Sequence, residues 1–305
     1  MPISFTIKQK GLFAAKKKPL PFEVILGDTL TYGSYPKENK DRMKMLSVGA
    51  TQFVAVVPHA FGRGIWVFWN KEERNKIRLL LPTPCHNEEI TELFHILARV
   101  SEYWDCTVIS SDRNRRIAPK NFEKERMAAR KYNRKALHEL IDLTGRVKGG
   151  IPLQCAGWPL TVTSEAAGTF LKTPTAFDEW LHTRLSIDAY YSRPDYYRFE
   201  DGTVEGEYDL FNDSWLILPY APFDMPGETF NENGKQVKAD RYTMHLFTEK
   251  AGDIIGVLPY DIFLRTLDKA KMHEYDGNCF LHDPLSSEEI EQIYEDGKKL
   301  MEETE

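Results

Sequence analysis

Apolar residues alternate with polar ones, or gather in short runs, along the first part of the chain. Residues 3–7 alternate, and residues 22–26 form a mostly apolar run that ends at a glycine and an aspartate. Three further apolar runs lie at 53–57, 65–69 and 77–81, and the first two are rich in β-branched and aromatic residues. Both patterns are typical of β-strands. The sequence therefore predicts short strands here, the last three of them as a meander.

Longer stretches repeat their apolar residues three and four positions apart, which is the spacing of one buried helix face. Between residue 87 and about residue 103 these positions are Ile90, Leu93, Phe94, Leu97 and Val100. Asn87 followed by two glutamates is a typical helix start. Residues 121–143 predict a second, basic helix that stops at Gly145. Residues 106–109 between them predict a short strand.

The second half of the chain mixes strands and helices in the same way. Residues 151–162 predict one or two strands, and a helix capped at Thr173 or Thr175 reaches about residue 187. Asp201-Gly202 predicts the tight turn of an aromatic hairpin formed by 196–199 and 203–211, and 215–218 predict a further strand. The fold class is therefore α+β, with mixed or antiparallel sheets and packed helices.

Gly149 and Gly150 interrupt the pattern, and we expect two α+β lobes, 1–147 and 148–305. The predicted element order of residues 65–143 returns in residues 241–303: two strands, a helix, a short cysteine-containing strand and a helix. An internal ββαβα duplication explains this order. Chance explains it too, because element orders recur often and the identities are few. If the duplication is real, a cleft between the halves is the first place to look for a site.

Composition narrows the class of protein. The 305 residues are 42% hydrophobic, enough for a substantial core, and the formal net charge of −6 argues against nucleic acid and anionic membranes as partners. The first thirty residues hold no long apolar run, so neither a signal peptide nor a membrane span is expected. Four scattered cysteines form no CxxC pair, which favours reduced, buried thiols in a cytoplasmic protein.

A basic stretch is the sharpest local feature. Residues 112–135 carry ten lysines and arginines against three acidic residues. Arg113, Arg115, Arg116 and Lys120 precede a predicted helix start, where free amides also attract negative charge, so they are candidates for binding a phosphate or carboxylate. The alternative is a solvated helix face that meets the acidic remainder of the protein. Interleaved aromatic residues are few, which argues against stacking of nucleic-acid bases.

Other candidate groups are weaker. Six possible metal donors lie between His273 and Asp283, but only Cys279 and His282 have a zinc-like spacing, and residues three apart in a strand face opposite sides. We therefore expect no metal, a buried Cys279 and a surface His282. Cys85 and His86 are adjacent, which is a poor arrangement for a thiolate dyad.

One acidic stripe is predicted within the aromatic hairpin. Glu205, Glu207 and Asp209 alternate along a strand and share one of its faces. The stripe could dock a basic partner, or it is a plain solvent face that protects a sheet edge from pairing.

Several short phrases carry a family resemblance. They are Ser-Phe-Thr-Ile at 4–7, Gly-Arg-Gly-Ile at 62–65, Leu-Leu-Leu-Pro-Thr-Pro at 79–84 and Gly-Ile-Pro-Leu at 150–153. With the chain length, they resemble an uncharacterised family of bacterial proteins, a domain of unknown function in Gram-positive bacteria. The resemblance implies a bacterial cytoplasmic protein and supplies no site residues.

The first functional hypothesis is a non-enzymatic binding or regulatory protein that holds a protein partner and uses no cofactor. It rests on an acidic, aromatic-rich chain in which no catalytic, metal or phosphate-loop pattern is found. The alternative is an enzyme or sensor that binds an anionic metabolite at residues 113–120.

Overall fold

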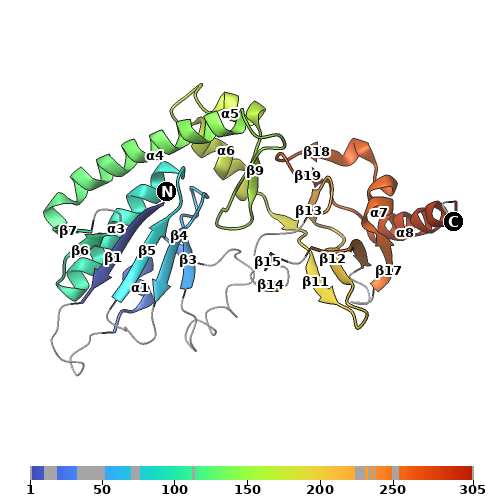
Figure 1. The fold of residues 1–305 in the computed structure, drawn as a ribbon, viewed down its shortest axis with the longest axis horizontal. Helices are drawn as coiled ribbons and strands as arrows, with labels where there is room; N and C mark the ends of the chain where they lie inside the picture. The colour runs from blue at the N-terminus through green and yellow to red at the C-terminus, as the bar shows by residue number, and fades with distance from the viewer. Residues whose placement is uncertain are drawn as a thin grey trace. The chain divides into compact units, whose positions relative to one another are not determined.

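The computed structural model describes residues 2–9, 19–32, 52–69, 76–111, 114–223, 231–232, 235–236, 238–248 and 254–303 (Figure 1). The chain forms two compact units, Met1–Ile187 and Asp188–Glu305. Each contains sheet and helix, so the α+β class is confirmed. The units divide at Ile187, whereas the sequence placed a boundary after residue 147. The reason is that strand β8 (Ile151–Leu153) and helix α5 (Ser164–Thr169) contact helix α4 (Phe122–Thr144) of the first unit.

The first unit is built on a seven-stranded sheet of order β2-β3-β4-β5-β1-β6-β7. Its strands are β1 (Ile3–Lys8), β2 (Thr31–Tyr32), β3 (Gln52–Val56), β4 (Ile65–Trp69), β5 (Lys76–Leu81), β6 (Val108–Ser110) and β7 (Arg115–Ile117). All neighbouring pairs are antiparallel. The predicted meander of β3, β4 and β5 is confirmed, and β1 inserts between β5 and β6.

Helix α3 (Asn87–Trp104) supplies the main apolar cover of this sheet. Its predicted apolar positions are all buried, and Phe94 packs edge-on against Phe5 of β1 with ring centroids 5.5 Å apart. The N-cap of the helix is His86, one residue before the expected cap Asn87, and it forms a reciprocal capping box with Glu89. Helix α4 follows a short 3-10 turn, Pro119–Asn121, and ends at Gly145 as predicted.

One predicted strand is wrong. Residues 22–26 form the short helix α1 (Phe22–Leu26), which ends where Gly27 takes a positive φ of 59° and donates its N–H to the Glu23 carbonyl. The side chain of Arg99 in α3 donates to the carbonyls of Val24 and Ile25, at 3.1 and 2.7 Å. A five-residue apolar run is too short to show the period of a helix or of a strand. The contacts with Arg99, which lies outside the run, favour the helix.

The remainder of the first unit follows the prediction closely. Residues 151–162 form a hairpin of β8 and β9 (Leu160–Val162). Helix α6 (Ala176–Leu185) begins after Thr175, one of the two expected caps. The preceding helix α5, capped by the Thr163 hydroxyl, was not predicted.

The second unit contains two four-stranded sheets, β10-β13-β19-β18 and β11-β12-β16-β17. The strands are β10 (Ala189–Tyr191), β11 (Asp195–Arg198), β12 (Val204–Leu210), β13 (Trp215–Pro219), β16 (Arg241–Phe247), β17 (Ile254–Pro259), β18 (Met272–Glu274) and β19 (Cys279–His282). A separate strand pair is formed by β14 (Asn231–Glu232) and β15 (Lys235–Gln236). Helix α7 (Tyr260–Thr266), a 3-10 turn (Lys269–Lys271) and helix α8 (Ser287–Glu302) complete the unit. The β11–β12 hairpin confirms the predicted strand pair around Asp201-Gly202. The two-residue turn is not formed, because strand pairing ends at Arg198 and Val204, and Gly202 but not Asp201 has a positive φ.

Helices α7 and α8 cover one face of the sheet β11-β12-β16-β17. Tyr208, Met244 and Leu258 point into this core and are buried. Two glycines let the layers approach, since a Cβ on Gly256 would collide with the ring of Tyr294 and one on Gly297 would collide with Leu258. Because side chains alternate along a strand, the odd-numbered residues of β12 and β16 lie on the opposite face.

The structure does not show the internal duplication. The element order does recur, but the sheets differ: β6 shares a sheet with β4 and β5, whereas β19 and β17 belong to different sheets. The two segments therefore share an order of elements along the sequence but differ in how their strands are arranged in sheets.

The four cysteines are free and buried. Among the described residues, the helices lack the combination of length and apolar character that crossing a bilayer requires.

Candidate functional site

The outer face of the sheet β11-β12-β16-β17 gathers acidic side chains of the β11–β12 hairpin and a histidine of β16. We call it the acidic face and define it by Asp195, Glu205, Glu207, Asp209 and His245. The register places Asp195 of β11 opposite Glu207, and His245 of β16 opposite Asp209. The predicted sharing of one strand face by Glu205, Glu207 and Asp209 is therefore confirmed. The sheet adds Asp195 and His245, which the sequence did not connect to them.

Glu205 is the buried and neutralised end of the acidic face. Its residue exposure is 6%, and one carboxylate oxygen accepts a hydrogen bond from Nε of Arg241, which also forms an ion pair with it. The other oxygen accepts a hydrogen bond from the Thr243 hydroxyl at 2.8 Å. Both partners come from the parallel neighbour β16. The charge of Glu205 is thus balanced within the protein.

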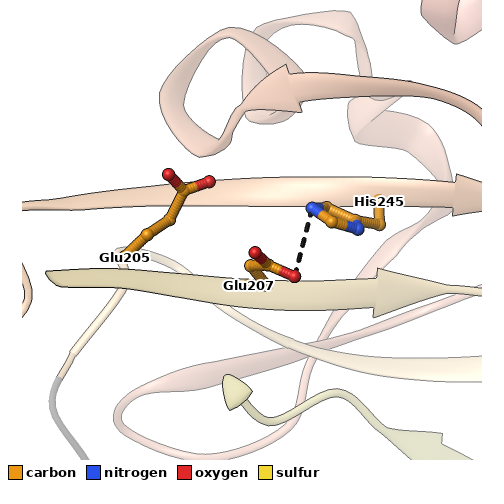
Figure 2. Close-up of side chains that lie close together, drawn as sticks. All are labelled: Glu205, Glu207 and His245. Carbon is orange, nitrogen blue, oxygen red and sulfur yellow. Dashed lines mark ion pairs between the residues drawn. The ribbon is translucent and has the colours of Figure 1, made fainter. Parts of the chain in front are cut away.

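The middle of the face is less well balanced. Nε2 of His245 lies 3.5 Å from a carboxylate oxygen of Glu207. Figure 2 shows these two side chains facing each other across the neighbouring strands. Burial raises the pKa of Glu207, with further contributions from Glu205 and Asp209, and the nearby His245 opposes this rise. Burial also raises the pKa of Asp209, again against the effect of His245. These two carboxylates are held where their charge is costly.

Exposed apolar side chains border the carboxylates. Tyr197 lies opposite Glu205, and the negative charges of Asp195 and Glu207 raise the pKa of its phenol. Phe199 lies 5.4 Å below the guanidinium carbon of Arg241. Beyond Asp209, the ring of Phe211 stacks on Phe247 at 5.1 Å. Each of the three bordering side chains Tyr197, Phe199 and Phe211 is more than a third exposed.

A metal is a chemical possibility at one end of the face. Glu205, Glu207 and His245 each offer a ligand atom within 4.8 Å of the others, and carboxylate with imidazole is a zinc-type donor set. However, both oxygens of Glu205 already accept hydrogen bonds, one of them from a cation. A divalent ion would have to displace Arg241 or tolerate its charge, so the donor set fits poorly.

Comparison with known proteins places the chain in a family. A family model described as domain of unknown function, DUF4299, matches residues 2–293. The chain belongs to this family. The match confirms the resemblance carried by the short phrases at 4–7, 62–65, 79–84 and 150–153; a bacterial source remains a prediction. No curated protein and no solved structure matches the chain.

Of the four basic residues chosen from the sequence, the structure of this DUF4299 chain describes Arg115, Arg116 and Lys120. Arg113 lies outside the described residues. Arg115 and Arg116 are neighbours on β7, so their side chains point to opposite faces of the strand. Arg115 pairs with Glu125 of α4 at 2.6 Å, and Lys120 is exposed in the 3-10 turn. This arrangement resembles the alternative prediction, a basic surface that meets the protein's own carboxylates; the anion site stays a prediction.

The remaining candidates, His282, Cys85 and His86, make contacts that support the fold. His282 was expected at the surface, which is wrong: it is fully buried, and its Nδ1 lies 2.7 Å from the carbonyl oxygen of Asp283. Its ring packs edge-on against Phe280, with ring centroids 6.5 Å apart, on a strand that lies between β13 and β18. The thiol of Cys85 faces the side-chain oxygen of Asn133 at 3.3 Å, and burial raises its pKa well above the usual range. His86 instead caps α3, so the two neighbours form no dyad.

Proposed function

We propose that the protein is a non-enzymatic binding protein that holds a basic segment of a protein partner on the acidic face. The observation that carries the proposal is the charge of this face: four carboxylates, Asp195, Glu205, Glu207 and Asp209, share it with one arginine, Arg241, among the described residues of β11, β12 and β16. The other arginine of these strands, Arg198, lies opposite Val204 and therefore on the other face. A lysine or arginine from a partner supplies the missing positive charge.

The raised pKa values of Glu207 and Asp209 support a cationic partner over a plain solvent face. A fully hydrated carboxylate has no reason for such a shift, whereas a half-buried one gains when a cation approaches. Carboxylates in this position can therefore form stronger bonds to a partner than those on an open surface.

The apolar border supports a peptide rather than an isolated ion. Lysine and arginine carry long apolar stems, and their charged groups are attracted to aromatic faces. Tyr197 and Phe199 offer such surface beside the carboxylates, and Val257, opposite His245 on β17, extends it. The four free cysteines are consistent with action in a reducing compartment such as the cytoplasm.

The test uses fluorescein-labelled decalysine and decaglutamate as probes, with fluorescence anisotropy at increasing sodium chloride. We expect saturable decalysine binding that weakens with salt, and none of decaglutamate. The double variant Glu207→Gln, Asp209→Asn should weaken decalysine binding about tenfold or more, the size of one or two lost charge pairs.

The matched control removes two exposed carboxylates of the same unit, Asp261→Asn on α7 and Glu291→Gln on α8. Its net charge equals that of the site variant, so any non-specific attraction falls equally in both. Equal losses in the two variants would overturn the proposal. Tight zinc binding that disappears in His245→Ala would replace it with a metal site.

A further inference from the structure

The first unit contains a pocket of about 520 Å³ that is separate from the acidic face. Its walls come from the start of α3, from α4, and from α6 with the two residues before it. Four of the lining side chains can bind a ligand through charged or hydrogen-bonding groups: His86, Arg130, Asp178 and His182. Arg130 belongs to the basic stretch noted in the sequence, but it lies in the third turn of α4 rather than in the loop before the helix.

The two histidines are fixed in the same tautomer. The backbone N–H of Glu88 donates to Nδ1 of His86 at 3.1 Å, and that of Phe61 donates to Nδ1 of His182 at 3.1 Å. A nitrogen that accepts a hydrogen bond carries no proton, so each neutral ring holds its hydrogen on Nε2. Burial lowers the pKa of His86, which favours this neutral form. Both rings therefore offer an Nε2–H donor.

This tautomer argues against a metal site or a general base. Either role needs the Nε2 lone pair, which would move the proton to Nδ1 and set it against a backbone N–H donor. The histidines suit recognition of an oxygen acceptor instead. Arg130 adds to this set: its Nη2 donates to Thr91 at 3.0 Å, and its Nε is buried without a hydrogen-bond partner among the described residues.

Asp178 gives the pocket a carboxylate, which accepts hydrogen bonds, whereas Arg130 and the two histidines donate them. One of its oxygens, Oδ2, accepts both hydrogen bonds from Asn87, at 3.3 Å from the backbone and 2.8 Å from the side chain. The same oxygen lies 3.9 Å from Nδ1 of His86. Those hydrogen bonds orient the carboxylate and leave Oδ1 for a ligand. Glu88 and Glu179 add negative charge and are exposed.

We propose that this pocket binds a small zwitterion of the amino-acid class, with its carboxylate on Arg130 and the histidine Nε2–H groups and its ammonium on Asp178. A zwitterion satisfies both sets of groups and adds no net charge to a pocket whose lining includes one arginine and one buried carboxylate. A simple anion leaves Asp178 without a partner and meets Glu88 and Glu179.

The binding test is a thermal-shift screen of the standard amino acids at millimolar concentration, followed by calorimetric titration of those that stabilise. We expect saturable stabilisation by at least one of them, because selective binding to the folded state raises its melting temperature. The N-acetylated and carboxamide forms of that amino acid should bind at least tenfold more weakly, since each removes one of the two charges.

Matched variants locate the site. Arg130→Met should abolish the stabilisation, whereas Lys131→Met, its exposed neighbour on α4, should leave it unchanged. Asp178→Asn keeps an oxygen for Asn87 and should also weaken binding. No stabilisation by any amino acid, equal effects of the two α4 variants, or undiminished binding of the N-acetyl form would each overturn the proposal.

A second measurement reads the histidines directly. Two-bond ¹H–¹⁵N NMR spectra at pH 7.5 should show His86 and His182 protonated at Nε2 and bare at Nδ1. Spectra that show the opposite tautomer, or chemical shifts of both rings that change on addition of zinc, would contradict the proposed amino-acid site. Neither result bears on the acidic face, because decalysine binding is measured with variants of the other unit.

Discussion

The imidazole of His245 lies 3.5 Å from the carboxylate of Glu207, and the two residues belong to adjacent parallel strands. The histidine partly offsets a carboxylate that burial destabilises. The acidic face is thus only partly compensated from within, and four consequences of this and of other local arrangements can be measured.

Decalysine binding should depend on pH in a defined direction. The pKa values of Glu207 and Asp209 are raised, so these groups retain protons at mildly acidic pH at which ordinary carboxylates are ionised. A cation binds the ionised form, and affinity should therefore rise with pH until both groups have lost their protons. Anisotropy titrations between pH 4.5 and 8 check this. The double variant Glu207→Gln, Asp209→Asn should give a flatter profile; an equally steep one would assign the titration elsewhere.

Removing the side chain of Asn133 should destabilise the first unit. Its oxygen accepts the backbone N–H of Cys85 at 2.8 Å, and its amide donates to the Cys85 carbonyl at 2.8 Å, all in buried surroundings. Asn133→Ala leaves two buried backbone groups unsatisfied, at a cost of about 2–4 kcal/mol in the free energy of unfolding. Urea unfolding measures it, with Lys131→Ala as the exposed control, expected within about 0.5 kcal/mol of the parent.

Glu89 should make a pH-dependent contribution to stability. Burial raises its pKa to about 7, although it accepts backbone hydrogen bonds from Gly64, Arg63 and His86. The folded state therefore holds a proton that the unfolded state releases near its usual value of 4.5. This contribution is fully present below that pH and is lost as pH rises to about 7.

The difference between the parent and Glu89→Gln isolates this contribution from those of other groups. Urea unfolding at pH 4.5, 5.5, 6.5 and 7.5 measures the free energy of unfolding of both proteins. The amount by which the parent exceeds Glu89→Gln should shrink as the pH rises. An advantage that grows with pH would mean that Glu89 is ionised throughout.

Two glycines in helices should respond oppositely to alanine. A Cβ on Gly168 in α5 meets no atom within 4 Å, so Gly168→Ala should stabilise by about 0.5–1 kcal/mol through helix propensity. A Cβ on Gly297 in α8 collides with Leu258 of β17, so Gly297→Ala should destabilise despite the same gain. Thermal unfolding of both variants compares them, and stabilisation by Gly297→Ala would show that the helix and sheet can move apart.

Features that depend on local spacing were predictable from the sequence. The 18-residue helix α3 shows its buried face in the positions of Ile90, Leu93 and Leu97, and the Asp201-Gly202 pair locates its hairpin within a few residues. Helix α1 was not predictable, because five apolar residues suit either structure and Arg99, far along the chain, supplies partners for its last carbonyls.

The candidate sites depend mainly on long-range pairing. Alternation alone placed Glu205, Glu207 and Asp209 together, but the register of β16 was needed to bring His245 and Arg241 to them. Similarly, Arg130 and Asp178 are far apart in sequence and share a pocket because α4 and α6 meet at the start of α3. An isolated arginine or histidine in a sequence does not indicate which distant residues it contacts in the fold. The sequence therefore favoured the basic residues at 113–120, which are close together along the chain.

The parallel pairing of β12 with β16 governs the order in which the acidic face can assemble. Two adjacent parallel strands cannot be joined by a tight turn, and here the intervening chain first forms β13 in the other sheet. Such non-local pairing is slow compared with closure of the β11–β12 hairpin. A nascent chain that has emerged only to Pro219 thus lacks Arg241 and His245, and the charges of Glu205 and Glu207 are partly balanced only once β16 has paired with β12.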